Sequence, residues 1–266
     1  MNEEFSFDEL DKLLLQHNGK IVHQIWFNLS WKSKKLLAKF SRYRHSWILK
    51  NPSFRYICWN EKIALELIKT CFPEYLELYK SYPHHIQRID ALRYFLLYRY
   101  GGFYADMDLE CVSSVDEIRS SFPGDLCLVE TGNKAMGTHV SNLFMFSIPN
   151  HPFWPTLFLE LYKAREGRWY YTKHLEIMYT TGPAFLNRMY CRYLYKYKFT
   201  VFPCELFNPL CLDKSRLQIE KIGLHTIHYG EGSWESGDSK FLIFFYCNWK
   251  LLLFVVCVMC TALRRK

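Results

Sequence analysis

The sequence predicts an α/β protein in which helices flank a central sheet. Short apolar runs typical of buried strands alternate with helical segments through the first half of the chain, and this alternation favours a layered α/β sheet. Half of the 266 residues are hydrophobic and 18% are aromatic, which is enough for a sizeable core and excludes a disordered chain. The ten cysteines lack zinc-ribbon spacing, so we expect mostly free, buried thiols.

Each element is expected where apolar residues follow a strand or helix period and turn residues bound the segment. In chain order, the first half is expected to contain a helix at Asp8–Leu15, a strand at Lys20–Trp26, a helix at Lys34–Leu49, a strand at Phe54–Trp59, a helix from the capping residue Asn60 through Thr70, a helix at His85–Tyr100 and a strand at Phe103–Ala105. The second half is expected to contain strands at Leu126–Glu130, Leu143–Ile148 and Leu224–His228 and helices at His151–Arg165 and Pro183–Tyr195.

The segment from residue 85 to residue 108 connects this pattern to chemistry. Ile89, Leu92, Leu96 and Tyr100 fall on one stripe of the expected helix, and Gly101-Gly102 ends it. The strand that follows stops at two aspartates. Ligands of α/β sheets gather at such carboxyl ends of strands, so a binding site is expected here, with the glycine pair turning the backbone beside the ligand.

Asp106 and Asp108 form a DxD motif at this strand end. Two carboxylates at this spacing can face one divalent ion, and oxygen ligands at an open site suit Mg²⁺ or Mn²⁺ that also binds phosphate oxygens. Such an ion offsets the charge on a departing diphosphate. A DxD pair on its own is also common in solvated turns, so the metal-binding interpretation depends on the neighbouring residues.

Asp90 and Arg93 lie three residues apart on the helix that leads to this turn. A carboxylate in that position can accept the hydroxyls of a sugar or ribose, and the guanidinium can pair with a diphosphate or hold Asp90 in place. The alternative is an ordinary surface salt bridge.

The residues Asp90-x2-Arg93-x3-Leu97-x3-Gly101-Gly102-x-Tyr104-x-Asp106-x-Asp108 resemble the signature of the DxD sugar-transferase family, which includes yeast α-mannosyltransferases and inositol-phosphorylceramide mannosyltransferases. Three further segments are similar to that family in the same order, and together they extend the resemblance over about residues 19–235. These segments are Lys20–Trp26, Asn142–Pro152 and His228–Trp234. The chain departs from the family at Ile89, where a small residue is usual.

The resemblance implies a GT-A fold with a Rossmann-like mixed sheet, a nucleotide-sugar donor and retention of anomeric configuration. It implies that Asp90, Arg93, Asp106 and Asp108 are catalytic. The same resemblance implies donor-binding roles for Trp26, Asp90, Arg93, Tyr104, Asp106, Asn142, Ser233 and Trp234, and metal-binding roles for Asp106, Asp108 and His228. The implied metal is Mn²⁺ or Mg²⁺.

Several of these residues have simpler interpretations. Trp26 can be a core residue at a strand end, and His228 can be an ordinary strand-end imidazole. His23 is expected to be a core histidine with satisfied hydrogen bonds, and His84-His85 a capping segment rather than a metal pair. The basic, aromatic run Tyr190–Tyr197 is expected on an amphipathic surface helix.

The two ends of the chain differ from the part between them. We expect three parts: an N-terminal helix in residues 1–18, a GT-A domain in residues 19–240 and a hydrophobic tail in residues 241–266. Phe241–Leu263 is long enough to span a bilayer, although Asn248 and Lys250 interrupt it. We therefore expect membrane association through this tail, with a buried strand plus helix as the alternative.

The predicted function is metal-dependent, retaining transfer of a hexose, mannose first, from GDP-mannose or a UDP-hexose to a glycan, glycolipid or protein. An inactive GT-A domain that binds carbohydrate or acts as a scaffold at a membrane is the alternative, and a nucleotide-sugar hydrolase or phosphotransferase is a third possibility. The expected location is an endomembrane of Golgi or ER type, with the cytoplasm as alternative. Residues 1–240 carry only about +4 of the net charge of +8, and no run of five basic residues occurs, so no nucleic-acid partner is expected.

Overall fold

The computed structural model describes residues 6–27, 34–131, 140–165, 170–208 and 223–230, together with Gly237. A six-stranded sheet in the order β2-β1-β3-β6-β5-β7 forms its centre. The strands are β1 (Ile21–Ile25), β2 (Arg55–Trp59), β3 (Gly102–Ala105), β5 (Leu126–Glu130), β6 (Val140–Ser147) and β7 (Thr200–Phe202). Strand β6 runs antiparallel to β3 and β5, and the other pairs are parallel, so the sheet is mixed.

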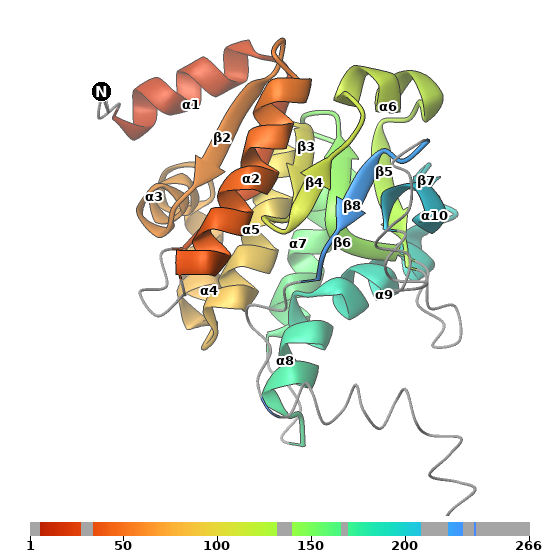
Figure 1. Ribbon diagram of the computed structural model, residues 1–266. Helices are drawn as coiled ribbons and strands as arrows, with labels where there is room; N and C mark the ends of the chain where they lie inside the picture. Colours follow the sequence, from red (N-terminus) through yellow and green to blue (C-terminus); the bar gives the residue numbers. More distant parts are fainter. Residues whose placement is uncertain are drawn as a thin grey trace, which may run out of the picture.

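Helices cover both faces of the sheet (Figure 1). One face packs against α1 (Phe7–Gln16), α3 (Glu61–Cys71), α4 (Leu76–Ser81), α5 (His85–Arg99), α7 (Phe153–Ala164) and α9 (Pro183–Tyr193). The other face packs against α2 (Lys34–Lys50), α6 (Val115–Ser121) and α10 (Cys204–Phe207). Helix α8 (Lys173–Thr180) packs against α5 and α9, and a short 3₁₀ turn, η1 (Pro73–Tyr75), precedes α4.

The two faces are built by alternation along each strand, because successive side chains point to opposite sides of a sheet. Tyr104 of β3 joins the core that contains α5, whereas its neighbours Phe103 and Ala105 join the core beneath α2. Residues Met145 and Phe144 of β6 divide in the same way. The predicted layered α/β arrangement, a mixed sheet flanked by helices, is thereby confirmed.

A second, two-stranded sheet joins distant parts of the sequence. Strands β4 (Leu109–Cys111) and β8 (Thr226–His228) pair antiparallel, with Leu109 opposite His228. Helix α2 holds this ribbon, because the Trp47 indole donates a hydrogen bond of 2.8 Å to the Leu109 carbonyl. The ribbon therefore carries a late segment of the chain to the end of β3.

Helix α5 is buried on more sides than its sequence predicts. Its stripe residues Leu92 and Leu96 are fully buried as expected, but Asp90, Arg93 and Tyr94 on other sides are buried as well. The predicted apolar stripe therefore accounts for only part of the buried surface of α5. The reason is that α5 lies between the sheet on one side and α7 and α8 on the other.

The glycine pair at residues 101 and 102 serves packing rather than ligand contact. Both residues have positive φ, +65° and +87°, which favours glycine. A Cβ on Gly101 would lie 2.6 Å from the Pro149 nitrogen, and one on Gly102 would collide with the Ile21 carbonyl. The pair stands at the start of β3, at the opposite end from Asp106. The prediction that it turns the backbone beside the ligand is wrong.

The expected strands and helices all form within the described residues, with shifted ends, and Asn60 caps α3 through a 2.9 Å bond from the Ile63 N–H. Seven elements were not predicted: η1, α4, β4, α6, α8, β7 and α10. The six described cysteines are free thiols, of which Cys191 is exposed rather than buried. Among the helices that the structure describes, none is long and apolar enough to cross a bilayer. The tail of residues 241–266 lies outside the described residues.

Candidate active site

The two aspartates of the DxD motif lie in the turn from β3 to β4. The Asp106 N–H donates to the Leu143 carbonyl at 2.9 Å, and the Asp106 carbonyl accepts a 3.0 Å bond from the Gln24 side chain. This main-chain anchoring places the motif at the end of β3, next to the end of β1. Strand β1 has β2 on one side and β3 on the other, so the strand order reverses at β1. α/β sheets bind ligands at the carboxyl ends of the strands where the order reverses.

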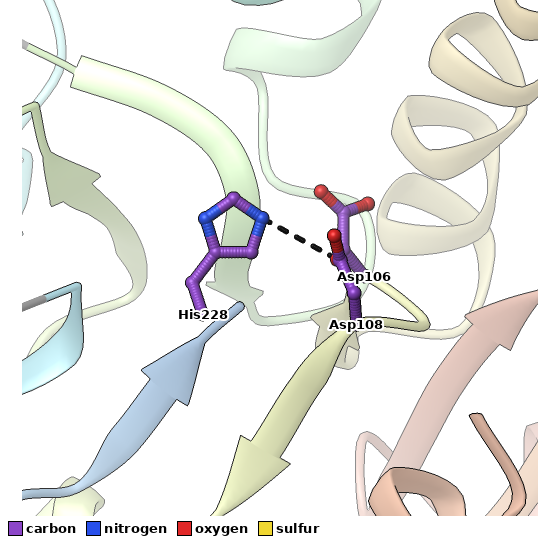
Figure 2. A group of neighbouring side chains, drawn as sticks. All are labelled: Asp106, Asp108 and His228. Atoms are coloured by element: carbon purple, nitrogen blue, oxygen red, sulfur yellow. Dashed lines mark ion pairs between the residues drawn. The ribbon is translucent and has the colours of Figure 1, made fainter. Parts of the chain in front are cut away.

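His228 meets the two aspartates because β8 pairs with β4. Its Nε2 atom lies 3.3 Å from Asp108 Oδ1, and one ligand atom from each of Asp106, Asp108 and His228 lies within 4.8 Å of the others. Figure 2 shows the three side chains converging from the β3–β4 turn and the end of β8. The structure therefore brings together the three residues of the predicted metal site.

The chemistry of this cluster fits a divalent cation. Two carboxylates and an imidazole are ligands that Mn²⁺ accepts, and the two oxygen ligands also suit Mg²⁺. Burial raises the pKa of Asp106 above its ordinary value, Arg93 opposes this shift, and the charge of Asp108 adds to it. A bound cation would favour the ionised form of both carboxylates and remove this repulsion.

Arg93 links the DxD motif to Asp90 on helix α5. Its guanidinium lies 2.9 Å from Asp90 Oδ1 and 3.2 Å from Asp106 Oδ1, and it donates a 2.8 Å hydrogen bond to the Asn142 carbonyl. The side chains of Arg93 and Asp90 are each only 4% exposed. The interpretation of this pair as a surface salt bridge is therefore wrong.

Asp90 is held by donors from three elements. Its Oδ1 accepts from Arg93 and, at 3.0 Å, from the Asn142 amide on β6, whereas Oδ2 accepts a longer bond of 3.4 Å from the Thr181 hydroxyl. Burial raises the pKa of Asp90 to about 6, Arg93 lowers it, and the nearby charge of Asp106 raises it further. The pKa of this carboxyl therefore lies above that of an ordinary aspartate.

Tyr104 and Asn142 complete one connected network. The Tyr104 hydroxyl donates to Asp106 Oδ1 at 2.7 Å, and its ring lies beneath the Arg93 guanidinium at 4.5 Å. Five residues predicted from the sequence thus contact one another in a chain of charged hydrogen bonds, and they are Asp90, Arg93, Tyr104, Asp106 and Asn142.

These residues line a cavity of about 560 Å³ together with Asp108, His228 and Trp26. Trp26 is half-buried at the end of β1, with its ring edge-on to Phe40 at 5.1 Å, so it is not the fully buried core residue of the alternative interpretation. His23 does match its core interpretation. Its Nε2 bonds to the Gly101 carbonyl, its Nδ1 accepts from the Trp59 indole, and burial lowers its pKa to about 4.

The other side of the cavity was not predicted. Residues from the α4–α5 connection, the start of α5, α8 and α9 line it, namely Pro83, His84, His85, Ile86, Lys173, Ile177 and Pro183. The capping role of His84 is confirmed, since its N–H donates to Gln87 Oε1 at 3.2 Å, but His84 also faces this cavity. The sequence does show a turn between two helices at Gly182-Pro183, but no sequence spacing connects this turn to the DxD motif. The predicted donor-binding residues Ser233 and Trp234 lie outside the described residues.

Comparisons with known proteins agree with this site. The sequence profile of a family described as "Glycosyltransferase sugar-binding region containing DXD motif" matches residues 38–123, which include Asp90 through Asp108. Residues 38–123 of the chain thus match the DXD-containing glycosyltransferase family. The resemblance to DxD sugar transferases that the sequence predicted is thereby confirmed.

Several curated relatives of the chain are yeast proteins. The chain is 28% identical over 236 residues to Inositol phosphoceramide mannosyltransferase 3 of Schizosaccharomyces pombe, which covers 89% of the chain and 61% of that protein. It is 32% identical to Mannosyl phosphorylinositol ceramide synthase SUR1 of Saccharomyces cerevisiae, over 65% of the chain and 42% of that protein. The chain thus spans about two fifths to three fifths of the length of these relatives. The solved structure of PaToxG glycosyltransferase aligns over 88% of both chains, with a TM-score of 0.49 and 16% identity.

Proposed function

We propose that this chain is a metal-dependent, retaining glycosyltransferase that moves a hexose, mannose first, from a nucleotide-sugar donor. The observation that carries the proposal is that one cavity joins the Asp106-Asp108-His228 cluster to the buried Asp90–Arg93 pair. A diphosphate needs a cation and a sugar needs hydrogen-bond acceptors, and the cavity is lined both by side chains that could bind a cation and by the Asp90 carboxylate.

The proposed roles follow from position. Asp106, Asp108 and His228 would hold Mn²⁺ or Mg²⁺, and the ion would offset charge on the leaving diphosphate. Asp90 accepts hydroxyls of the sugar, and Arg93 keeps that carboxylate ionised and fixed.

The remaining proposed residues bind the donor around this centre. Trp26 at the cavity wall stacks on the base, Tyr104 supports Asp106, and Asn142 faces the sugar. Ser233 and Trp234 are proposed to close over the diphosphate.

The donor and the acceptor are proposed from the relatives. Their printed names describe mannosyl transfer to inositol phosphoceramide, so we propose GDP-mannose as donor and an inositol-phosphate glycolipid as acceptor, with glycans and proteins as further candidates. A lipid acceptor fits membrane association, for which residues 241–266 are the proposed means, and an endomembrane location of Golgi or ER type.

The test is GDP-mannose turnover by the full chain with and without Mn²⁺, using Asp108→Ala and, as a matched control, replacement of the exposed Asp116 by Ala. We expect Mn²⁺-dependent turnover that Asp108→Ala lowers by about 100-fold or more, because charge on the leaving group is left unstabilised. The control should retain wild-type turnover.

Three other results would contradict the proposal. Donor binding without turnover, with acceptor lipid present, would support the inactive binding domain. Mannose release that no acceptor accelerates would support a hydrolase. Wild-type turnover by Asp108→Ala in Mn²⁺ would remove the DxD motif from the mechanism.

A further inference from the structure

The turn between α8 and α9 meets helix α5 at Asp90, and no sequence motif pointed to it. Thr180 and Thr181 are almost fully buried there. Thr180 accepts a 2.8 Å hydrogen bond from the Gln87 side chain, and the Thr181 carbonyl accepts a 2.7 Å bond from the Tyr94 hydroxyl. Two residues of α5 therefore hold the turn in place on either side of Asp90.

The contacts around Asp90 close into a ring. The Asn142 amide donates to Asp90 Oδ1 at 3.0 Å and to the Tyr94 hydroxyl at 3.3 Å. Tyr94 donates in turn to the Thr181 carbonyl, and the Thr181 hydroxyl returns to Asp90 Oδ2. Because the ring uses α5, β6 and the α8–α9 turn, the rotation of the Asp90 carboxylate depends on all three elements.

The two oxygens of Asp90 differ in the acceptor capacity that remains. A carboxylate oxygen has room for about two donors. Oδ1 already accepts from Arg93 and Asn142 at 2.9 and 3.0 Å. Within the described residues, Oδ2 receives only the 3.4 Å bond from Thr181. Since Asp90 lines the cavity, Oδ2 is the oxygen with capacity for a ligand hydroxyl.

Gly182 keeps space next to this oxygen. A Cβ at Gly182 would lie 3.3 Å from Asp90 Oδ2 and 2.9 Å from the Ile177 carbonyl. Its φ of −81° is accessible to any residue, so space rather than backbone conformation favours glycine here. Pro183 follows at the first turn of α9 and lines the cavity itself.

We propose that Thr181 and Gly182 are positioning residues of the donor-sugar subsite. The Thr181 hydroxyl sets the rotation of the Asp90 carboxylate so that Oδ2 accepts a hydroxyl of the hexose, and Gly182 leaves the space that this orientation needs. This inference rests on the proposed function, because it assigns the sugar half of the donor to Asp90.

The test compares two ligands in Mn²⁺, GDP-mannose and GDP, which differ by the sugar. Dissociation constants are measured by calorimetry for the full-length wild type and for Thr181→Val, which keeps the volume and loses the hydroxyl. We expect Thr181→Val to weaken GDP-mannose about tenfold, the effect of about one charged hydrogen bond, and to leave GDP unchanged. Thr181→Ser should restore the affinity for GDP-mannose.

The matched control is Thr180→Val, which removes an equally buried hydroxyl one residue away that faces Gln87 rather than Asp90. It should lower stability without changing the ratio of the two affinities. If Thr181→Val does not fold, Thr181→Ala, whose smaller side chain fits the same space, replaces it in both measurements.

An equal change in both affinities, or none, on loss of the Thr181 hydroxyl would show that the turn is only structural and would overturn the inference alone. If the wild type binds neither ligand, the proposed function and the inference fall together.

Discussion

Replacement of Arg93 by Met is the perturbation whose effect the structure defines most closely. Arg93 contacts Asp90, Asp106 and the Asn142 carbonyl at 2.9, 3.2 and 2.8 Å. Methionine fills a similar length but offers no charge and no donor, so both carboxylates lose their shared cation. Arg93→Lys keeps the charge but replaces a planar fork with a single ammonium.

The expected loss of stability follows from burial. Removing one partner of a buried ion pair typically costs about 3–5 kcal/mol, because the remaining charge is left without compensation. We expect a loss in this range for Arg93→Met at pH 7. For Arg93→Lys we expect about 2 kcal/mol, since one or two charged hydrogen bonds are lost and the cation stays.

The loss for Arg93→Met should depend on pH in a defined direction. Without Arg93 the carboxyls of Asp90 and Asp106 rise further in pKa and bind protons in the folded state that they do not bind in the unfolded state. A raised folded pKa makes stability increase as pH falls. From pH 7 to pH 5, the free energy required to keep one such carboxyl protonated falls by about 2.7 kcal/mol. Asp90 in the wild type, with a pKa of about 6, shares part of this gain. The deficit of the variant should therefore shrink by about 1–3 kcal/mol.

The assay is chemical denaturation of wild type and variants at both pH values. Arg88 on the same helix provides the control, since its 3.0 Å pair with Glu61 is partly exposed. Arg88→Met should cost about 1 kcal/mol or less. If Arg93→Met lowers the free energy of unfolding by less than 1 kcal/mol, or by the same amount at both pH values, the buried ion pairs of Arg93 with Asp90 and Asp106 do not stabilise the protein as argued.

Two further predictions concern the cavity. GDP-mannose affinity should fall as pH decreases through about 6 while GDP affinity changes less, because protonation removes the Asp90 acceptor. The Asp90→Asn variant should not show this pH dependence. A wild-type pH profile that is identical for both ligands would contradict the proposed role of Asp90 as a sugar acceptor. Tyr229 stacks on Tyr43 at 4.6 Å and its N–H bonds to the Asp108 carbonyl at 3.1 Å, next to His228. Tyr229→Leu should weaken Mn²⁺ binding up to about tenfold in a titration, the effect of one aromatic pair. Tyr229→Phe should bind Mn²⁺ like the wild type, and equal binding by the Leu variant would exclude the stack as a support of His228.

The sequence by itself determined the elements whose signals are local. The apolar runs at β1, β3 and β5 and the capped start of α3 needed only neighbouring residues, because burial on both faces of a sheet produces continuous apolar strands. The DxD motif and the Asp90–Arg93 spacing were recognisable for the same reason, as short patterns on one strand end and one helix turn. The resemblance to sugar transferases supplied the rest of the predicted site.

Tertiary structure decided everything that depends on distant pairing. The sequence could not show that β8 pairs with β4, because both are three-residue strands whose pairing depends on α2 and Trp47. That pairing alone brings His228 to Asp108. Nor could helical spacing show that Arg93 is buried, since the same i,i+3 pattern forms a salt bridge on a surface helix. The α8–α9 turn reaches Asp90 only through packing of α8 against α5, so no spacing in the sequence linked Thr181 and Gly182 to Asp90.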